Sequence, residues 1–92
     1  MIVRILGEGQ VSVDDAAVSE LNELDSALEA AVERGDEAAF RRALDALLGK
    51  IRAIGKPLDA ADLEPSGLIL PGADATMDEV RGLMSDDGLI PG

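Results

Sequence analysis

The chain has 92 residues with no histidine, cysteine, tryptophan or tyrosine, and its 19 carboxylates against 8 basic groups give a net charge of −11. These absences exclude disulfides, thiolate metal sites and catalysis by His or Cys, while the negative charge disfavours binding to nucleic acid or to an anionic membrane surface. Because 47% of the residues are hydrophobic, we expect one folded domain over residues 1–92 rather than a disordered chain.

Residues 1–13 are predicted to form a β-hairpin. Ile2–Leu6 and Gln10–Val13 are apolar runs rich in β-branched residues, and Gly7-Glu8-Gly9 joins them. Glycine adopts the positive φ angles that such a short connection needs. A phosphate-binding loop is the alternative for this Gly-x-Gly, but the third glycine and the Lys-Ser/Thr pair of such loops are missing.

Residues 14–55 are predicted to form an antiparallel helical hairpin. The first helix is capped by Asp14 and Asp15 and runs to Arg34, and the second is capped by Asp36 and runs to Ile54. Apolar residues recur at steps of three and four along both helices: Ala17, Leu21, Leu24, Leu28 and Ala31, then Phe40, Leu44, Leu47, Ile51 and Ile54. The turn between the helices is similar to that of a tetratricopeptide repeat, but no second copy follows, which favours an ordinary helical hairpin.

Residues 56–92 are punctuated by proline and glycine. Two apolar stretches, Leu68–Leu70 and Leu89-Ile90, are predicted to lie over the core as extended segments, the first of them as a third strand. A capping box formed by Thr76 and Glu79 starts a short helix over 76–84. We expect this helix to turn four side chains inward: Met77, Val80, Leu83 and Met84. The overall prediction is an α+β fold.

The sequence offers no candidate catalytic, cofactor-binding or metal-binding residue. Its acidic pairs, such as Asp14-Asp15 and Asp86-Asp87, fall at predicted helix starts or in turns, where capping and solvation explain them. Asp74, Thr76 and Asp78 alternate like the first ligands of an EF-hand loop, but glutamate stands where that loop needs glycine. We therefore predict that the protein is not an enzyme and needs no cofactor.

The two long helices differ in charge: residues 14–34 carry −6 and residues 35–56 carry +2. Opposite the apolar seam of the second helix lies a stripe of small residues with one arginine: Ala39, Arg42, Ala46, Gly49 and Ala53. Because glycine inside a helix costs about 1 kcal/mol relative to alanine, this stripe is a candidate partner interface, together with Leu89 and Ile90. The alternatives are that the stripe is an ordinary solvated surface, or that the C-terminal segment covers it.

Several segments carry a resemblance to a known family: Met1-Ile2-Val3-Arg4-Ile5, Gly7-Glu8-Gly9-Gln10, Leu21-Asn22-Glu23-Leu24-Asp25, Pro65-Ser66-Gly67-Leu68-Ile69-Leu70-Pro71, Ala73-Asp74-Ala75-Thr76 and Asp86-Asp87-Gly88-Leu89-Ile90-Pro91-Gly92. Over essentially its whole length the chain resembles the PspA-associated protein family, PspAA, which accompanies phage shock protein A in actinobacteria and archaea. Gly67 and Gly72 depart from the family pattern, where a polar residue and a proline are expected.

The resemblance implies a cytoplasmic accessory of the envelope-stress response that works with PspA, a coiled-coil protein that assembles on membranes. It implies no catalytic residues. No stretch of the sequence is long and apolar enough for a signal peptide or a membrane span, so we expect recruitment to the inner face of the membrane through the partner, without direct insertion. The alternatives are a self-associating homodimer or oligomer, and a small acidic ligand-binding domain with two inward carboxylates.

Overall fold

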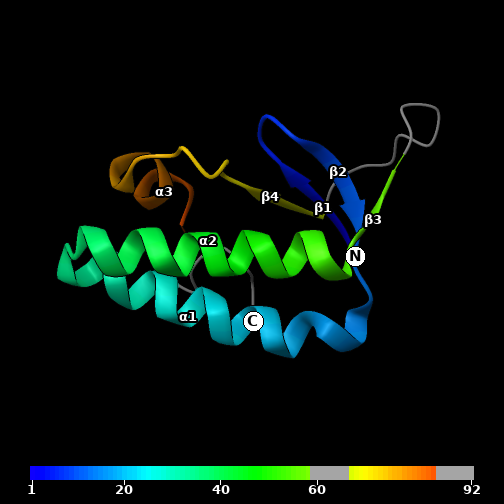
Figure 1. Cartoon of the computed structure of the whole chain (residues 1–92), viewed down its shortest axis with the longest axis horizontal. Helices are drawn as coiled ribbons and strands as arrows, with labels where there is room; N and C mark the ends of the chain where they lie inside the picture. Colours follow the sequence, from blue (N-terminus) through cyan, green and yellow to red (C-terminus); the bar gives the residue numbers. More distant parts are fainter. Residues whose placement is uncertain (59–66, 85–92) are drawn as a thin grey trace.

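The computed structural model describes residues 1–58 and 67–84, in which two long helices cover one face of a small sheet (Figure 1). The elements in chain order are β1 (Ile2–Ile5), β2 (Gly9–Ser12), the 3₁₀ turn η1 (Asp15–Ala17), α1 (Val18–Arg34), α2 (Glu37–Ile54), β3 (Lys56–Pro57), β4 (Leu68–Leu70) and α3 (Met77–Leu83). This arrangement confirms the predicted α+β fold. The predicted extended segment at Leu89-Ile90 lies outside the described residues.

The sheet has four strands in the order β3-β2-β1-β4. β1 and β2 form the predicted antiparallel hairpin, whose turn places Gly7 and Gly9 at φ +86° and +111°. β4 is the expected additional strand, and it pairs parallel to β1. Lys56–Pro57 adds a fourth strand along β2. The sequence did not indicate this strand, because a proline shortly after a helix usually marks only the end of that helix. Pro57 is tolerated in β3 because an edge strand does not need every backbone N–H for pairing.

The helical hairpin forms as predicted, with one difference at its start. Asp14 caps a short 3₁₀ turn by accepting the Ala16 N–H at 3.0 Å, and the α-helix itself begins only at Val18. Gly35 ends α1 in the left-handed conformation at φ +67°. The Asp36 carboxylate accepts the Ala39 N–H at 3.1 Å and so caps α2.

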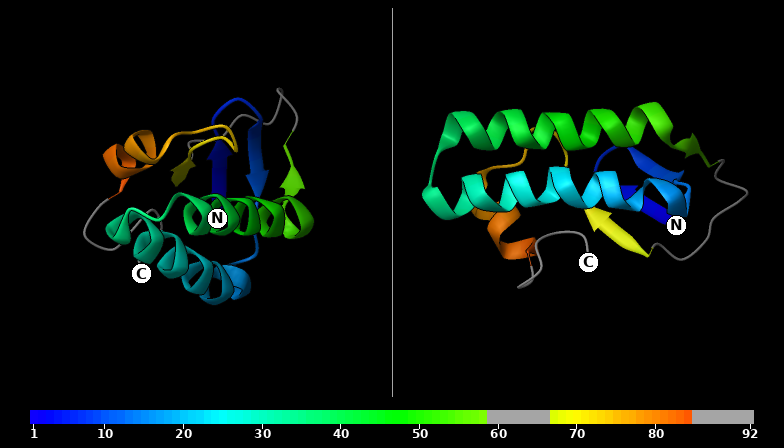
Figure 2. Two further views of the ribbon diagram at one scale, coloured as in Figure 1. Left: turned by 60° about the vertical axis from the view of Figure 1, so that its left-hand side comes forward. Right: turned by 90° about the horizontal axis from the view of Figure 1, so that it is seen from below.

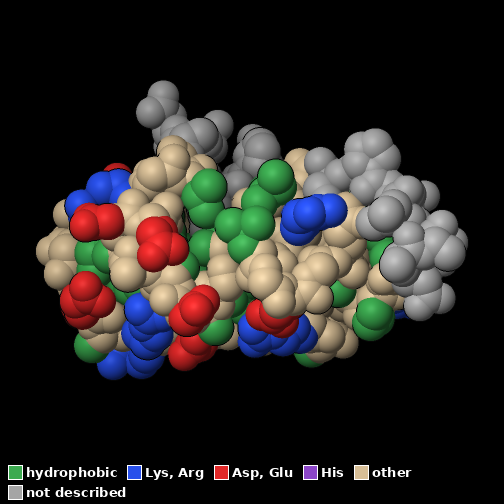
Figure 3. Space-filling model, turned by 90° about the horizontal axis from the view of Figure 1, so that it is seen from above, with side chains coloured by type: hydrophobic (Ala, Val, Ile, Leu, Met, Phe, Trp, Pro, Cys, Tyr) green, Lys and Arg blue, Asp and Glu red, His purple; other side chains and the backbone are tan. Residues whose placement is uncertain are grey.

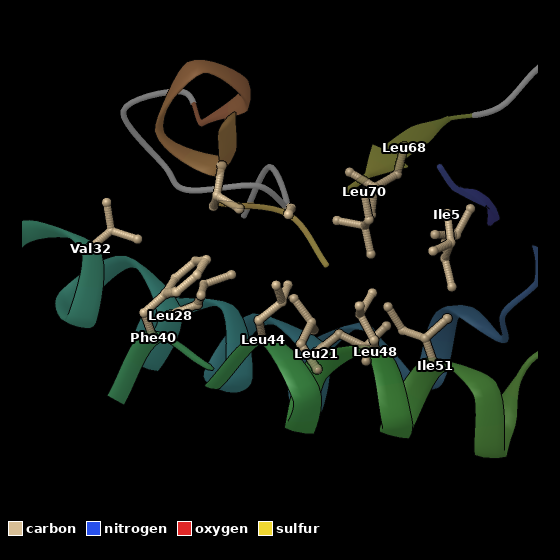
Figure 4. Close-up of a cluster of buried hydrophobic side chains, with 14 of the residues drawn as sticks. Ile5, Leu21, Leu28, Val32, Phe40, Leu44, Leu48, Ile51, Leu68 and Leu70 are labelled. Atoms are coloured by element: carbon tan, nitrogen blue, oxygen red, sulfur yellow. The ribbon is translucent and has the colours of Figure 1, made fainter. Parts of the chain in front are cut away.

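The core lies between the helices and the sheet. Figure 4 shows side chains of α1 and α2, among them Leu21, Leu44 and Leu48, pointing toward Ile5 and Leu70 of the sheet. The views in Figure 2 show both helices on this one side of the sheet. Most residues of the predicted seam are fully buried, and burial of such aliphatic side chains supplies the main stabilising free energy.

The predicted seam of α1 is displaced by part of a turn. Leu24 is only half-buried, whereas Val32 and, unexpectedly, Asp25 are buried. The buried positions of α1 therefore follow Leu21, Asp25, Leu28 and Val32 as well as the predicted Ala31. In α2, Leu48 is buried and Ile54 is only partly so.

The short helix α3 is held by its cap and by two arginines. The Thr76 hydroxyl accepts the Glu79 N–H at 3.2 Å, and the Glu79 carboxylate accepts the Thr76 hydroxyl at 3.3 Å rather than a backbone N–H. Arg41 of α2 donates to the carbonyls of Ala73 and Ala75. Arg81 of α3 donates to the Val32 carbonyl of α1 at 2.9 Å. These bonds hold the segment after β4 against the helical hairpin.

One prediction for this helix is wrong. Val80 is buried and Met77 and Met84 pack at the margin of the core, but the Leu83 side chain is 44% exposed. A helix this short contacts the core along one narrow stripe, which the steps of three and four from Met77 through Val80 to Met84 define. Leu83 lies beside that stripe and faces away.

Candidate interaction site

The small-residue stripe of α2 lies largely on the surface. Arg42, Ala46, Gly49 and Ala53 are exposed and follow one another at steps of four, three and four, which places them on one face of the helix. Ala39 is half-buried and packs at the margin of the core. The two remaining candidate interface residues, Leu89 and Ile90, lie outside the described residues.

Gly49 has open space in front of it. A Cβ atom built at this position would meet no heavy atom within 4 Å in the described part of the chain. Gly55, by contrast, is needed for close packing, since its Cβ would lie 2.6 Å from the Ile51 carbonyl oxygen and 3.0 Å from the Val11 side chain. Of these two glycines, Gly55 permits close approach within the fold, whereas Gly49 leaves a shallow backbone surface open.

The cations of α2 differ in what they contact. Lys50 pairs with Glu20 of α1 at 2.9 Å, Arg52 pairs with Glu8 of the β1–β2 turn, and Arg41 bonds backbone carbonyls. Arg42 has no carboxylate within 4.0 Å among residues 1–58 and 67–84, and it is the cation that belongs to the stripe. Three cations of α2 therefore bind groups within the fold, whereas Arg42 contributes positive charge to the stripe.

The Glu8–Arg52 pair links the turn of the hairpin to the C-terminal part of α2. Arg52 Nε donates to Glu8 Oε1 at 2.8 Å, and its Nη2 donates to Oε2. This hydrogen bonding to Arg52 lowers the pKa of the Glu8 carboxyl below its ordinary value of 4.5 and raises the pKa of the Arg52 guanidinium. Both side chains are about two-fifths exposed, so solvent screens the pair.

Two hollows lie near the same end of the molecule. One of about 290 Å³ is bordered by the Glu8–Arg52 pair, Val11, Gly55 and Leu58, and another of about 330 Å³ is bordered by Ser12, Asp14, Ile54 and Lys56. Among the described residues, each hollow is lined by a single carboxylate, and each of these has a structural partner: Glu8 binds Arg52, and Asp14 caps η1. The described residues therefore do not supply either hollow with the two inward carboxylates that a small acidic ligand-binding domain would use.

Sequence reasoning missed Asp25. Its side chain is 2% exposed within the core face of α1 and takes part in a polar or electrostatic interaction. The signal was present in the sequence, because position 25 continues the spacing from Leu21 toward Leu28 and Val32. A carboxylate at an apolar position of a helix indicates a structural role at the core.

Comparison with known protein families settles the classification. The family model described as PspAA, PspA-Associated protein, matches residues 1–92, which is the whole chain. The chain belongs to the PspAA family. This confirms the resemblance inferred from the sequence and associates the chain with the PspA system. Comparison with curated proteins and with solved structures gave no significant match.

Two observations complete the description of this PspAA chain. Across residues 1–58 and 67–84, no three or more acidic side chains gather closely enough to hold a metal ion. None of the helices in that part of the chain has the length and apolar character needed to cross a membrane.

Proposed function

We propose that this PspAA chain is a non-enzymatic interaction module that binds PspA and acts with it in the envelope-stress response. The observation that carries the proposal is the match of the PspAA family model to the whole chain. In this proposal the protein works in the cytoplasm and reaches the inner face of the membrane through PspA, a coiled-coil partner, without inserting into lipid itself.

The proposed PspA-binding surface is the exposed stripe of α2, with Ala39, Leu89 and Ile90 as its further members. Small side chains around Gly49 allow the backbone of a partner helix to approach closely, and the open space at Gly49 supports this use. Arg42 supplies a positive charge that has no acidic partner within the described residues. Both features suit a charged helix of a coiled coil.

Co-purification with PspA tests the proposal. We expect PspA to retain the wild-type chain at low salt and less of it at high salt, since Arg42 contributes a screened interaction. Replacing Gly49 with leucine should reduce retention while the protein stays folded. The matched control is Ala27→Leu, which enlarges an exposed small residue on α1 instead. Equal retention of wild type and Gly49→Leu would exclude the stripe as the binding surface.

Self-association is the second candidate, because the same exposed stripe could pack against that of another copy. Light scattering of the isolated chain separates the two functions. A monomer that forms a larger species only with PspA supports the interaction module, whereas a dimer lost in Gly49→Leu supports the homodimer.

A further inference from the structure

The face of the sheet that points away from the helices forms a second surface. Side chains alternate along a strand, and residues paired between neighbouring strands share a face. Val3, Ile5, Leu68 and Leu70 are buried toward the helices. Ile2 and Arg4 alternate with Val3 and Ile5 along β1, so their side chains lie on the opposite side of the sheet. The residues paired with them lie on that side too: Ser12 pairs with Ile2, Lys56 pairs with Ser12, and Ile69 pairs with Arg4. We call this side the outer sheet face; it comprises Ile2, Arg4, Leu6, Ser12, Lys56 and Ile69, with the buried Gln10 opposite Arg4.

The outer sheet face carries an exposed apolar pair on its β1–β4 side. Leu6 and Ile69 are 47% and 49% exposed, and they are two of the three large hydrophobic side chains exposed in the described part of the chain. They lie close together, because the Leu6 N–H donates to the carbonyl of Leu70, the residue after Ile69. Figure 3 looks onto this side of the molecule and shows hydrophobic side chains gathered near its middle, with a cationic side chain beside them.

The charge of this face is opposite to that of the protein. Arg4 and Lys56 are exposed, and neither has a carboxylate within 4.0 Å among residues 1–58 and 67–84. Glu8, the carboxylate nearest in sequence to Arg4, is held by Arg52. In a chain with a net charge of −11, this face thus presents two cations that have no acidic partner within the described residues, with Arg4 directly beside Ile69 and Lys56 on the opposite edge strand.

We propose that the outer sheet face is a docking surface for an amphipathic protein helix whose apolar stripe is bordered by Asp and Glu. The apolar stripe would cover Leu6 and Ile69, and the acidic border would meet Arg4 and Lys56. The four strands are separated by three spacings of about 4.8 Å, so the face is roughly 14 Å wide, which accommodates one helix of about 10 Å diameter. An anionic lipid surface is a poorer occupant, because it repels the acidic remainder of the molecule. This surface is distinct from the α2 stripe and does not depend on its role.

Titration of the ¹⁵N-labelled full chain with a designed peptide tests this assignment. The probe is a helix of about three heptads with Leu at a and d and Glu at e and g, and its comparison peptide carries Lys in place of Glu. We expect the Glu peptide to shift the amide signals of β1, β2, β3 and β4, and to bind at least about tenfold more tightly than the Lys peptide. Shifts confined to α2, or equal affinity for the two peptides, would overturn the proposal.

Charge reversal of the surface provides the matched variants. Arg4→Glu with Lys56→Glu should weaken binding of the Glu peptide by about tenfold or more and improve binding of the Lys peptide. Arg34→Glu at the end of α1, an exposed position outside both proposed surfaces, should change neither. Lys56→Glu alone should change the two peptide affinities in the same directions but by less, and it replaces the double variant in this test if the double variant does not fold. Vesicles of phosphatidylglycerol and phosphatidylethanolamine provide the final comparison. Wild-type binding to them that the double variant loses would identify a lipid site and refute the helix-docking proposal.

Discussion

Replacing Gly49 with alanine should stabilise the protein. The Cβ added at this position meets no heavy atom within 4 Å in the described part of the chain, so the substitution introduces no clash there. Gly49 lies inside α2, where glycine costs about 0.8–1 kcal/mol relative to alanine. The free energy of unfolding should rise by about that amount. For a domain of this size, this corresponds to an increase in Tm of about 4–8 °C.

Urea unfolding followed by circular dichroism measures this change. We expect a higher midpoint with an unchanged m-value, because the surface exposed on unfolding stays the same. Gly55→Ala is the internal control. Its Cβ would lie 2.6 Å from the Ile51 carbonyl oxygen, and relieving this clash should destabilise the protein by about 1–3 kcal/mol.

The result for Gly49→Ala discriminates between the interpretations of the stripe. A stabilised variant indicates that the stripe is open in the free protein and available to a partner. A variant destabilised by about 1 kcal/mol or more would refute this reasoning, because it would mean that the chain itself already packs closely against Gly49.

Three further predictions follow from the core, the cap of α3 and the Glu8–Arg52 pair. Leu44→Ala removes a fully buried side chain and should cost about 2–5 kcal/mol in urea unfolding, and a loss below about 1 kcal/mol would contradict the assigned core. Thr76→Ala removes the acceptor of the Glu79 N–H and should weaken α3 by about 1 kcal/mol, seen as faster amide exchange in α3 and unchanged exchange in α1. Because the pKa of Glu8 is lowered in the folded state, its pairing with Arg52 stabilises the protein above pH 4.5 and this contribution is lost as the pH falls through the lowered pKa. The stability difference between wild type and Glu8→Gln should therefore shrink on acidification, and a difference that grows would contradict the assigned pair.

The fold was predictable where local chemistry and periodicity agreed. Gly35 marked the end of α1, and Asp36 marked the start of α2. The apolar residues from Phe40 to Ile51 identified the buried face of α2, and Thr76 marked the start of α3. These signals act over a few residues, so a single sequence contains them.

The parts that were missed depend on partners distant in the sequence. β3 exists because Lys56–Pro57 reaches β2, although glycine and proline locally indicate a helix stop. The pairing of Glu8 with Arg52 joins residues 44 positions apart, and no local pattern specifies it.

The surfaces were only partly predictable. Helical spacing placed Arg42, Ala46, Gly49 and Ala53 on one exposed face, because the geometry of a helix fixes this arrangement. The outer sheet face was not foreseen, since it combines Arg4, Leu6 and Ile69 through the parallel pairing of β1 with β4. The sequence of neither strand specifies this register, because it depends on how the folded chain brings β1 and β4 together.

The central claim is that this PspAA chain binds PspA directly through the exposed stripe of α2. Size-exclusion chromatography with light scattering, applied to mixtures of the two purified proteins, tests it most directly. Wild type and Ala27→Leu should each form a species larger than either component, while Gly49→Leu should remain separate from PspA. Absence of a complex with the wild-type chain, or an equally stable complex with Gly49→Leu, would contradict the account.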